Sequence, residues 1–150
     1  MKSDTVIVCP DTVNEPKELG LTVKQVSAGE KFEVLGIRFE AVPAYNISKP
    51  FHPNSNGWLG YIIDSPDHGR IYIAGDTDIT PDNKRVKCDI ALIPAGGTYT
   101  TDALQAAELA NTIRPKYAIP MHYGTVVGSP ADGEKFRKAV DSGIEVVIKI

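Results

Sequence analysis

RIYIAGDTD, at residues 70–78, is an apolar run that ends at Gly75 and is followed at once by Asp76, Thr77 and Asp78. Its Ile and Tyr content, bounded by Gly and Asp, predicts a strand over Arg70–Ala74. A carboxylate at the end of a strand is held by the sheet while it stays open to a site, which suits a metal ligand. The alternative is an ordinary turn that uses Gly and Asp for their backbone tolerance.

A second stretch of the same kind is PKYAIPMHYG, at residues 115–124, in which a predicted strand ends at Pro120 and presents His122. Imidazole at that place can bind a divalent metal through one nitrogen while a neighbouring acceptor holds the other. The alternative is a structural histidine. The order of the two stretches, with a strand ending in PAGG and a helix between them, is more informative than either alone.

Around these stretches the chain divides into a β-rich first half and an α/β second half. The first half is predicted to begin as an antiparallel meander and, after an irregular loop over Pro43–Gly57, to close with a hairpin joined by DSPDHG. The strands expected there are Thr5–Cys9, Leu21–Val26, Lys31–Val34, Ile37–Val42, Trp58–Ile63 and Arg70–Ala74. The second half is predicted to contain strands Ile90–Ile93, Tyr117–Ile119 and Ile144–Ile148 and helices Thr101–Ile113 and Pro130–Val140.

The two helices carry recognisable signals. In the first, Leu104, Ala107, Ala110 and Ile113 are expected to form one apolar face, and Pro115 ends the helix. In the second, Ser129 is expected to be the N-cap, with Pro130 at the first helical position.

Composition and net charge limit the classes of partner that the chain is expected to bind. The chain has 150 residues, 42% of them hydrophobic, and a net charge of -3. These values predict one domain and favour neither nucleic-acid nor membrane binding, so a small-molecule substrate, a metal or another protein chain is the expected partner. We expect a cytoplasmic protein, since the N-terminus lacks the apolar core of a secretory signal. Cys9 and Cys88 are expected to be buried thiols without a metal or redox role.

Taken together, five stretches carry a family resemblance. They are VPAYN, FHPNSNGWLGYII, RIYIAGDTD, DIALIPAGGTYTTDALQAAE and PKYAIPMHYG. Residues 42–139, and more weakly the chain from Thr5, resemble the C-terminal half of the metallo-β-lactamase superfamily, in particular its branch of small metal-dependent hydrolases similar to ascorbate-phosphate lactonases. The resemblance implies one α/β domain over residues 1–150, formed as the C-terminal portion of an αββα sandwich that lacks the N-terminal strands.

The same resemblance implies site residues. The aspartate matching Asp76 bridges two metal ions, and the histidine matching His122 binds one of them. The implied ion is zinc, with manganese as the alternative. Tyr99, in the loop after the PAGG strand, is an expected substrate contact, although Gly96 and Gly97 in that loop also suit a plain strand-to-helix turn.

The sequence also departs from the family pattern. The superfamily motif His-x-His-x-Asp-His is absent, because the three histidines, His52, His68 and His122, do not cluster. A further ligand histidine of the family would fall near Ala44–Asn46, where none is present. His52 is therefore a candidate substitute ligand, and Asn46 and Tyr45 are candidate substrate contacts, whereas no catalytic residue can be assigned.

The expected activity is hydrolysis of an ester, lactone, amide or phosphoester by a metal-bound hydroxide. Because so few ligands are present, we expect little activity from this chain alone, which should either form a homodimer or require an N-terminal half. The rival function is a non-catalytic binding or self-association module that retains the fold. A calcineurin-like phosphoesterase is a weaker rival, since Gly-Asp-x-Asp is present but Gly-Asn-His and Gly-His-x-His are not.

Overall fold

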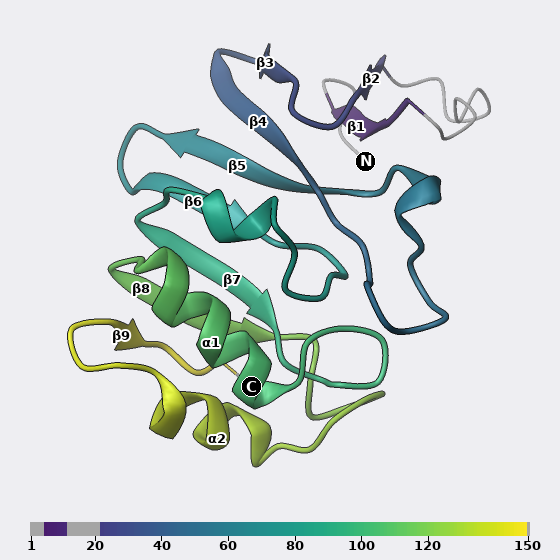
Figure 1. Cartoon of the computed structure of the whole chain (residues 1–150). Coiled ribbons are helices and arrows are strands. Elements are labelled where there is room, and N and C mark those ends of the chain that lie inside the picture. Colours follow the sequence, from purple (N-terminus) through teal and green to yellow (C-terminus); the bar gives the residue numbers. More distant parts are fainter. Residues whose placement is uncertain (1–4, 12–21, 150) are drawn as a thin grey trace.

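The structure, a computed structural model, describes residues 5–11 and 22–149. The described chain forms a seven-stranded sheet with the strand order β3-β4-β5-β6-β7-β8-β9 (Figure 1). The strands are β3 Lys31–Val34, β4 Ile37–Pro43, β5 Leu59–Ser65, β6 Gly69–Ile73, β7 Ile90–Pro94, β8 Tyr117–Met121 and β9 Glu145–Val146. A two-stranded sheet contains β1 Val6–Pro10 and β2 Thr22–Val26. The predicted α/β class is confirmed.

The large sheet is antiparallel at one side and parallel at the other. Strands β3 to β6 pair antiparallel, and the predicted hairpin of β5 and β6 is present. Strands β6 to β9 pair parallel, because helical or irregular connections return the chain to the same edge each time. The C-terminal ends of β6, β7 and β8 therefore lie at one edge of the sheet.

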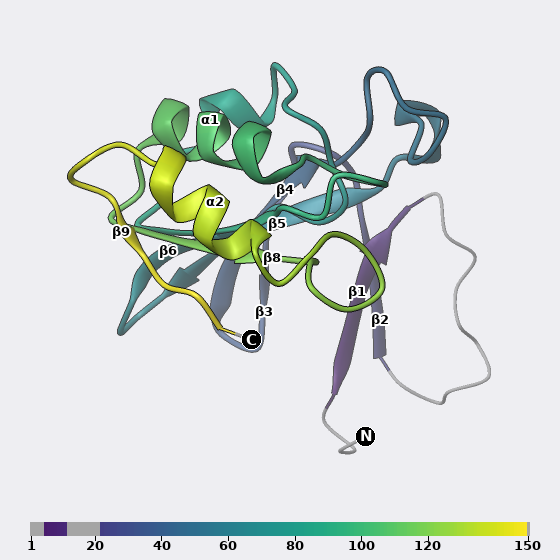
Figure 2. The ribbon, with the colours of Figure 1, turned by 90° about the horizontal axis from the view of Figure 1, so that it is seen from below.

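Helices α1 (Ala103–Ile113) and α2 (Asp132–Ala139) cover the same face of the sheet (Figures 1 and 2). Beneath them lies the main core, in which Tyr72, Ile93, Leu109 and Phe136 are fully buried. The predicted apolar face of α1 was wrong in one residue. Leu104 is 63% exposed, and the buried face contains Ala103, Ala106, Ala107, Leu109, Ala110 and Ile113.

The opposite face of the sheet is only half-covered. Burial alternates along β6, β7 and β8: the residues under the helices are buried, and their neighbours in sequence are half-exposed. The half-exposed aliphatic residues of this open face are Ile63, Ile71, Ile73, Ile90, Leu92 and Ile119. Strands β3, β4 and β5 do not cover this face, because they extend the same sheet by hydrogen bonding.

The first two strands also correct the predicted meander. Strands β1 and β2 pair parallel with each other and form a separate sheet. Residues 11–21 separate them, which is about the dozen residues that a parallel connection needs. Val26 of β2 and Val8 of β1 pack with Phe32 and Ala41, so this small sheet lies over the β3–β4 end. Leu21, placed at the start of β2 by the sequence, lies outside the described residues.

Two helix starts differ from prediction. Asp102 is the N-cap of α1, where its carboxylate accepts from the backbone N–H groups of Leu104 and Gln105. Helix α2 begins only at Asp132, and Ser129 is not its N-cap. Ser129 instead lies in the preceding turn, where its backbone N–H donates to Asp132 Oδ2 at 2.6 Å and its carbonyl accepts from the Asp132 N–H.

Cys9 and Cys88 are free and half-buried, and burial raises the pKa of the Cys88 thiol to about 11. That pKa disfavours the reactive thiolate near neutral pH. No helix in the described ranges is long and apolar enough to cross a membrane.

Candidate metal centre

Asp76 and His122 meet at the edge where the parallel strands end. Asp76 follows β6 after a turn at Gly75, whose φ of 68° is in the left-handed region that glycine adopts without strain. His122 follows β8 directly. His122 Nε2 lies 3.6 Å from Asp76 Oδ1. Strands β6 and β8 are not neighbours, because β7 lies between them, but their parallel direction brings both residues to the same edge.

His52 completes the cluster from a distant part of the sequence. It lies in the predicted irregular loop between β4 and β5, which contains only the short 3₁₀ turn η2 (Asn54–Asn56). His52 Nε2 lies 3.3 Å from Asp76 Oδ2, so the histidine does point toward the Asp76–His122 pair. Its side chain is 17% exposed, against 37% for each of the other two.

The distances fit a carboxylate that bridges two cations. Each histidine nitrogen approaches a different oxygen of Asp76, His52 at Oδ2 and His122 at Oδ1. Two ligand atoms that share a tetrahedral zinc ion through bonds of about 2.1 Å are roughly 3.4 Å apart. The observed separations of 3.3 and 3.6 Å match that value. The donor set therefore suits one histidine per ion with Asp76 between the ions.

The cluster does not provide three ligands to any single ion. Within residues 5–11 and 22–149, no group of three His, Cys, Asp or Glu side chains is placed to hold one metal ion. An ion beside either oxygen of Asp76 would thus receive at most one histidine nitrogen and one carboxylate oxygen from the described chain. Tetrahedral zinc needs four ligands, so the remaining positions require other groups or water.

Both histidines have a strained backbone. In the described part of the chain, four residues other than glycine have positive φ: Leu35, His52, Arg114 and His122. Leu35 precedes Gly36 in a hairpin turn, and Arg114 caps α1. His52 and His122, with φ of 46° and 57°, have no such ordinary reason. Strain of this kind persists where the surroundings fix it and is concentrated at functional sites.

Gly96 allows the loop after β7 to pass close to His122. It is buried, and a Cβ atom at this position would collide with the His122 carbonyl and lie 2.7 Å from Val127. Gly96 therefore does more than serve the predicted strand-to-helix turn. Its missing side chain lets the segment that contains Tyr99 approach the histidine.

With the geometry in place, comparison with known proteins decides the family. Residues 7–123 match the model of the β-lactamase superfamily domain. The chain belongs to that superfamily. A UPF0173 protein of Pyrococcus furiosus is 37% identical over 140 residues, 91% of this chain. A UPF0173 metal-dependent hydrolase of Methanopyrus kandleri is 33% identical over 137 residues, 85% of this chain.

A solved structure agrees. A protein named as a metal-dependent hydrolase, from Parabacteroides distasonis, superposes with a TM-score of 0.81 and 38% identity over 99% of this chain. The predicted metallo-β-lactamase fold is thus confirmed. The chain spans 62% of the Pyrococcus protein, 59% of the Methanopyrus protein and 66% of the Parabacteroides structure.

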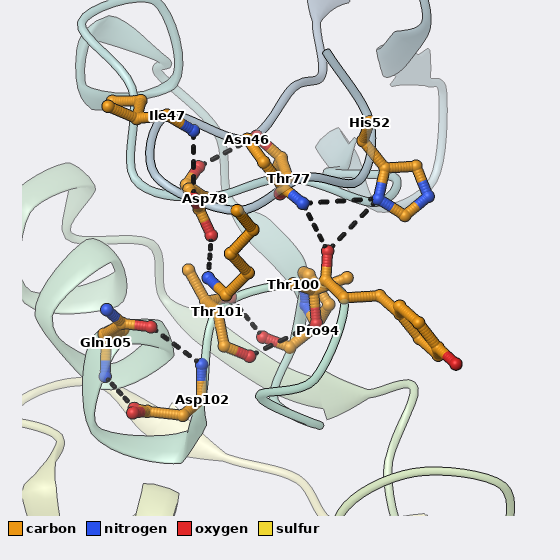
Figure 3. A network of polar contacts seen from close by, with 12 residues as sticks. Asn46, Ile47, His52, Thr77, Asp78, Pro94, Thr100, Thr101, Asp102 and Gln105 are labelled. Atoms are coloured by element: carbon orange, nitrogen blue, oxygen red, sulfur yellow. Dashed lines mark hydrogen bonds and ion pairs between the residues drawn. The ribbon is translucent and has the colours of Figure 1, made fainter.

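Sequence reasoning missed the contacts that hold the site loops. Asp78 is buried and accepts from the backbone N–H of Ile47 at 3.0 Å and from the ammonium of Lys49 (Figure 3). These contacts fasten the loop that contains His52 to the segment that contains Asp76. The second aspartate of GDTD was the available signal, but nothing in the sequence identified Lys49 as its partner.

Asn83 also stabilises the segment that follows β6. It is fully buried at the start of the 3₁₀ turn η3 (Asn83–Arg85). Its side-chain amide donates to the Asp78 carbonyl at 2.8 Å, and its Oδ1 accepts from the Thr80 N–H at 2.9 Å. A buried amide with both ends satisfied rigidifies the backbone that it bridges. The residues after β6 are therefore held on both sides.

The three expected substrate contacts have different surroundings. Tyr99 packs its ring edge-on against Phe51, with 4.8 Å between centroids. Asn46 is buried, and its amide donates to the Tyr99 carbonyl. Tyr45 turns its hydroxyl to Asp82, to which it donates at 3.0 Å. Burial, together with that bond, raises the pKa of Tyr45. Of these three residues, Tyr99 and Asn46 contact the His52 ring.

Proposed function

We propose that the chain forms one side of a two-ion metal centre in a metal-dependent hydrolase. Asp76 bridges the ions, His122 binds one and His52 the other. The convergence of both Nε2 atoms on separate oxygens of one carboxylate carries this proposal. The ion is zinc, with manganese as the alternative, since imidazole with carboxylate suits zinc and more carboxylate-rich sites suit manganese.

Such a pair of ions would lower the pKa of a bound water and orient it for attack on an acyl or phosphoryl centre. The substrate is a small ester, lactone, amide or phosphoester. Tyr99, Asn46 and Tyr45 are proposed as its contacts, with Tyr99, which is half-exposed and packs its ring on Phe51, as the first of them. We place the protein in the cytoplasm.

Titration with zinc tests the centre. We expect His52→Asn and His122→Asn each to weaken zinc binding by more than about tenfold, because each removes the nitrogen ligand of one ion. Asparagine tolerates positive φ, so the backbone at both positions can be kept. His68→Asn, in the exposed turn between β5 and β6, is the matched control and should bind zinc as the parent does. Equal affinity in all four proteins would rule out the centre.

Turnover by the chain alone should be low, because two protein ligands per ion hold a metal weakly. With excess zinc, we expect hydrolysis of a simple ester or phosphodiester to stay near the rate given by zinc in buffer. Metal-dependent turnover well above that rate, lost in His122→Asn, would show that the chain completes the site itself.

The open sheet face supports the second candidate, a self-association module. Six aliphatic side chains there are half-exposed, and contiguous apolar patches of this kind mark interaction surfaces in soluble proteins. A homodimer that pairs this face with its copy would cover both patches at once. This candidate differs from the hydrolase in needing no metal.

Light scattering at micromolar concentration tests the dimer. We expect a dimer for the parent chain and a monomer for Ile71→Lys, since Ile71 lies between Ile63 of β5 and Ile90 of β7 on the open face. Leu104→Lys places the same charge on the exposed side of α1 and should stay dimeric. A monomeric parent chain, or dissociation by both substitutions, would contradict this interface.

A further inference from the structure

Two polar side chains, those of Asn46 and His52, meet at the backbone carbonyl of Tyr99. The carbonyl oxygen lies 2.8 Å from Asn46 Nδ2 and 3.2 Å from His52 Nδ1. The two nitrogens are 3.4 Å apart (Figure 3). Because a carbonyl can only accept, this triangle constrains the protons on both side chains.

The Asn46 amide has one acceptable orientation. Exchanging its nitrogen and oxygen would set Oδ1 at 2.8 Å from the Tyr99 carbonyl, with two acceptors facing each other. Nδ2 is therefore the donor. This assignment leaves Asn46 Oδ1 as a buried atom without a hydrogen-bond partner within the described chain, a destabilising feature that the Tyr99 contact must help to offset.

The His52 ring has two alternatives. With Nδ1 unprotonated, it would accept from Asn46 over 3.4 Å, and its lone pair would face the Tyr99 carbonyl at 3.2 Å. With Nδ1 protonated, it donates to the carbonyl, whose second lone pair is free for it. The second arrangement has no clash of acceptors at the Tyr99 carbonyl and uses the shorter of the two Nδ1 distances.

The other ring nitrogen also faces an acceptor. His52 Nε2 lies at an ion-pair distance of 3.3 Å from Asp76 Oδ2, whereas Nδ1 makes a hydrogen-bond contact of 3.2 Å with the Tyr99 carbonyl. In the neutral ring, the proton on Nδ1 thus has a bond, and the Nε2 lone pair faces the carboxylate.

We propose that the Tyr99 carbonyl fixes neutral His52 as the Nδ1–H tautomer, so that Nε2 presents a lone pair toward Asp76, and that Asn46 is the positioning residue that holds this carbonyl. The proposal rests on the proposed metal centre only for what Nε2 then binds. It makes the ring ready for a cation before any cation arrives, since a ligand histidine must be unprotonated at the binding nitrogen.

Other contacts keep the ring in this place. The Asn46 backbone N–H donates to the His52 carbonyl at 2.8 Å, which closes the loop over residues 46–52. The Trp58 ring contacts the imidazole with 5.0 Å between centroids. These contacts hold His52 at its positive φ. Asn46 is therefore bonded to both the histidine and the carbonyl that the histidine uses.

Nitrogen-15 NMR of the metal-free protein tests the tautomer. At a pH well above the usual histidine pKa of about 6.5, protonated and unprotonated ring nitrogens give well-separated shifts. We expect Nδ1 of His52 to be the protonated nitrogen, whereas exposed His68 in the same spectrum should show a mixture. An unprotonated Nδ1 in His52 would overturn the inference, whatever the zinc result.

Asn46→Ala tests the positioning role, with Asn54→Ala in the same loop as the control, since Asn54 is exposed. We expect Asn46→Ala to move His52 toward the His68 mixture and to weaken zinc binding roughly tenfold, as loss of a ligand's hydrogen-bonded support does. Unchanged tautomer and affinity would remove Asn46 from the proposal. If the parent protein shows a protonated Nδ1 but does not bind zinc, the result supports the proposed tautomer and contradicts the proposed metal centre.

Discussion

We expect Asp76→Asn to reduce zinc affinity at both positions by more than about 100-fold, which exceeds the roughly 10–100-fold loss that follows removal of a ligand's hydrogen-bonded partner. An amide carries no charge, so it cannot stand between two cations as the carboxylate does. Because Asp76 contacts both histidines, its loss should affect both ions, whereas each histidine variant should affect one. Calorimetric titration with zinc measures the affinity and the stoichiometry.

The control for this variant is Asp67→Asn, in the exposed turn between β5 and β6. It should bind zinc as the parent does. The metal-free stability of Asp76→Asn should also change by no more than about 0.5 kcal/mol, as for a partly exposed site. Zinc binding by Asp76→Asn at parental affinity would remove the bridging role.

We expect Lys49→Met to destabilise the protein by about 3 kcal/mol, because it leaves the buried carboxylate of Asp78 without its counter-charge. Only 9% of the Asp78 side chain is exposed, and 21% of that of Lys49. The Ile47 N–H remains as a neutral donor and cannot replace the ammonium. Urea unfolding at a fixed protein concentration gives the free energy of unfolding.

The matched control is Arg137→Met, which removes an exposed ion pair with Glu134 on α2 and should cost no more than about 0.5 kcal/mol. Adding Asp78→Asn to Lys49→Met should recover part of the loss, since no unpaired charge remains. A loss in Lys49→Met no larger than that of the control would mean that the pair does not hold the His52 loop.

Local patterns in the sequence were enough for most of the elements. The two helices, the β5–β6 hairpin and the strands before Asp76 and His122 follow from the spacing of apolar residues and from the Gly, Pro, Asn and Asp residues that bound each element. Parallel strands end at the same edge of a sheet. Asp76 and His122, which follow the ends of such strands, therefore lie at one edge. The parallel pairing of β1 and β2 was missed, because a strand's periodicity does not encode its partner.

The remaining parts of the site depend on contacts between distant residues. Asn46 and Tyr99 are 53 positions apart, and Lys49 and Asp78 are 29 apart. No local pattern predicts such pairs. The positive φ of His52 is equally hidden, because it is imposed by the closed loop and the Trp58 ring and not by a glycine. The sequence identified His52 as a candidate ligand, but it could not predict the direction in which the His52 side chain points.

Anomalous X-ray scattering at the zinc absorption edge, from crystals of the chain grown with zinc, tests the metal centre most directly. The account predicts two peaks, one between Asp76 and His52 and one between Asp76 and His122, each about 2 Å from its ligand atoms. Zinc bound elsewhere on the chain, with no peak beside Asp76, would contradict it.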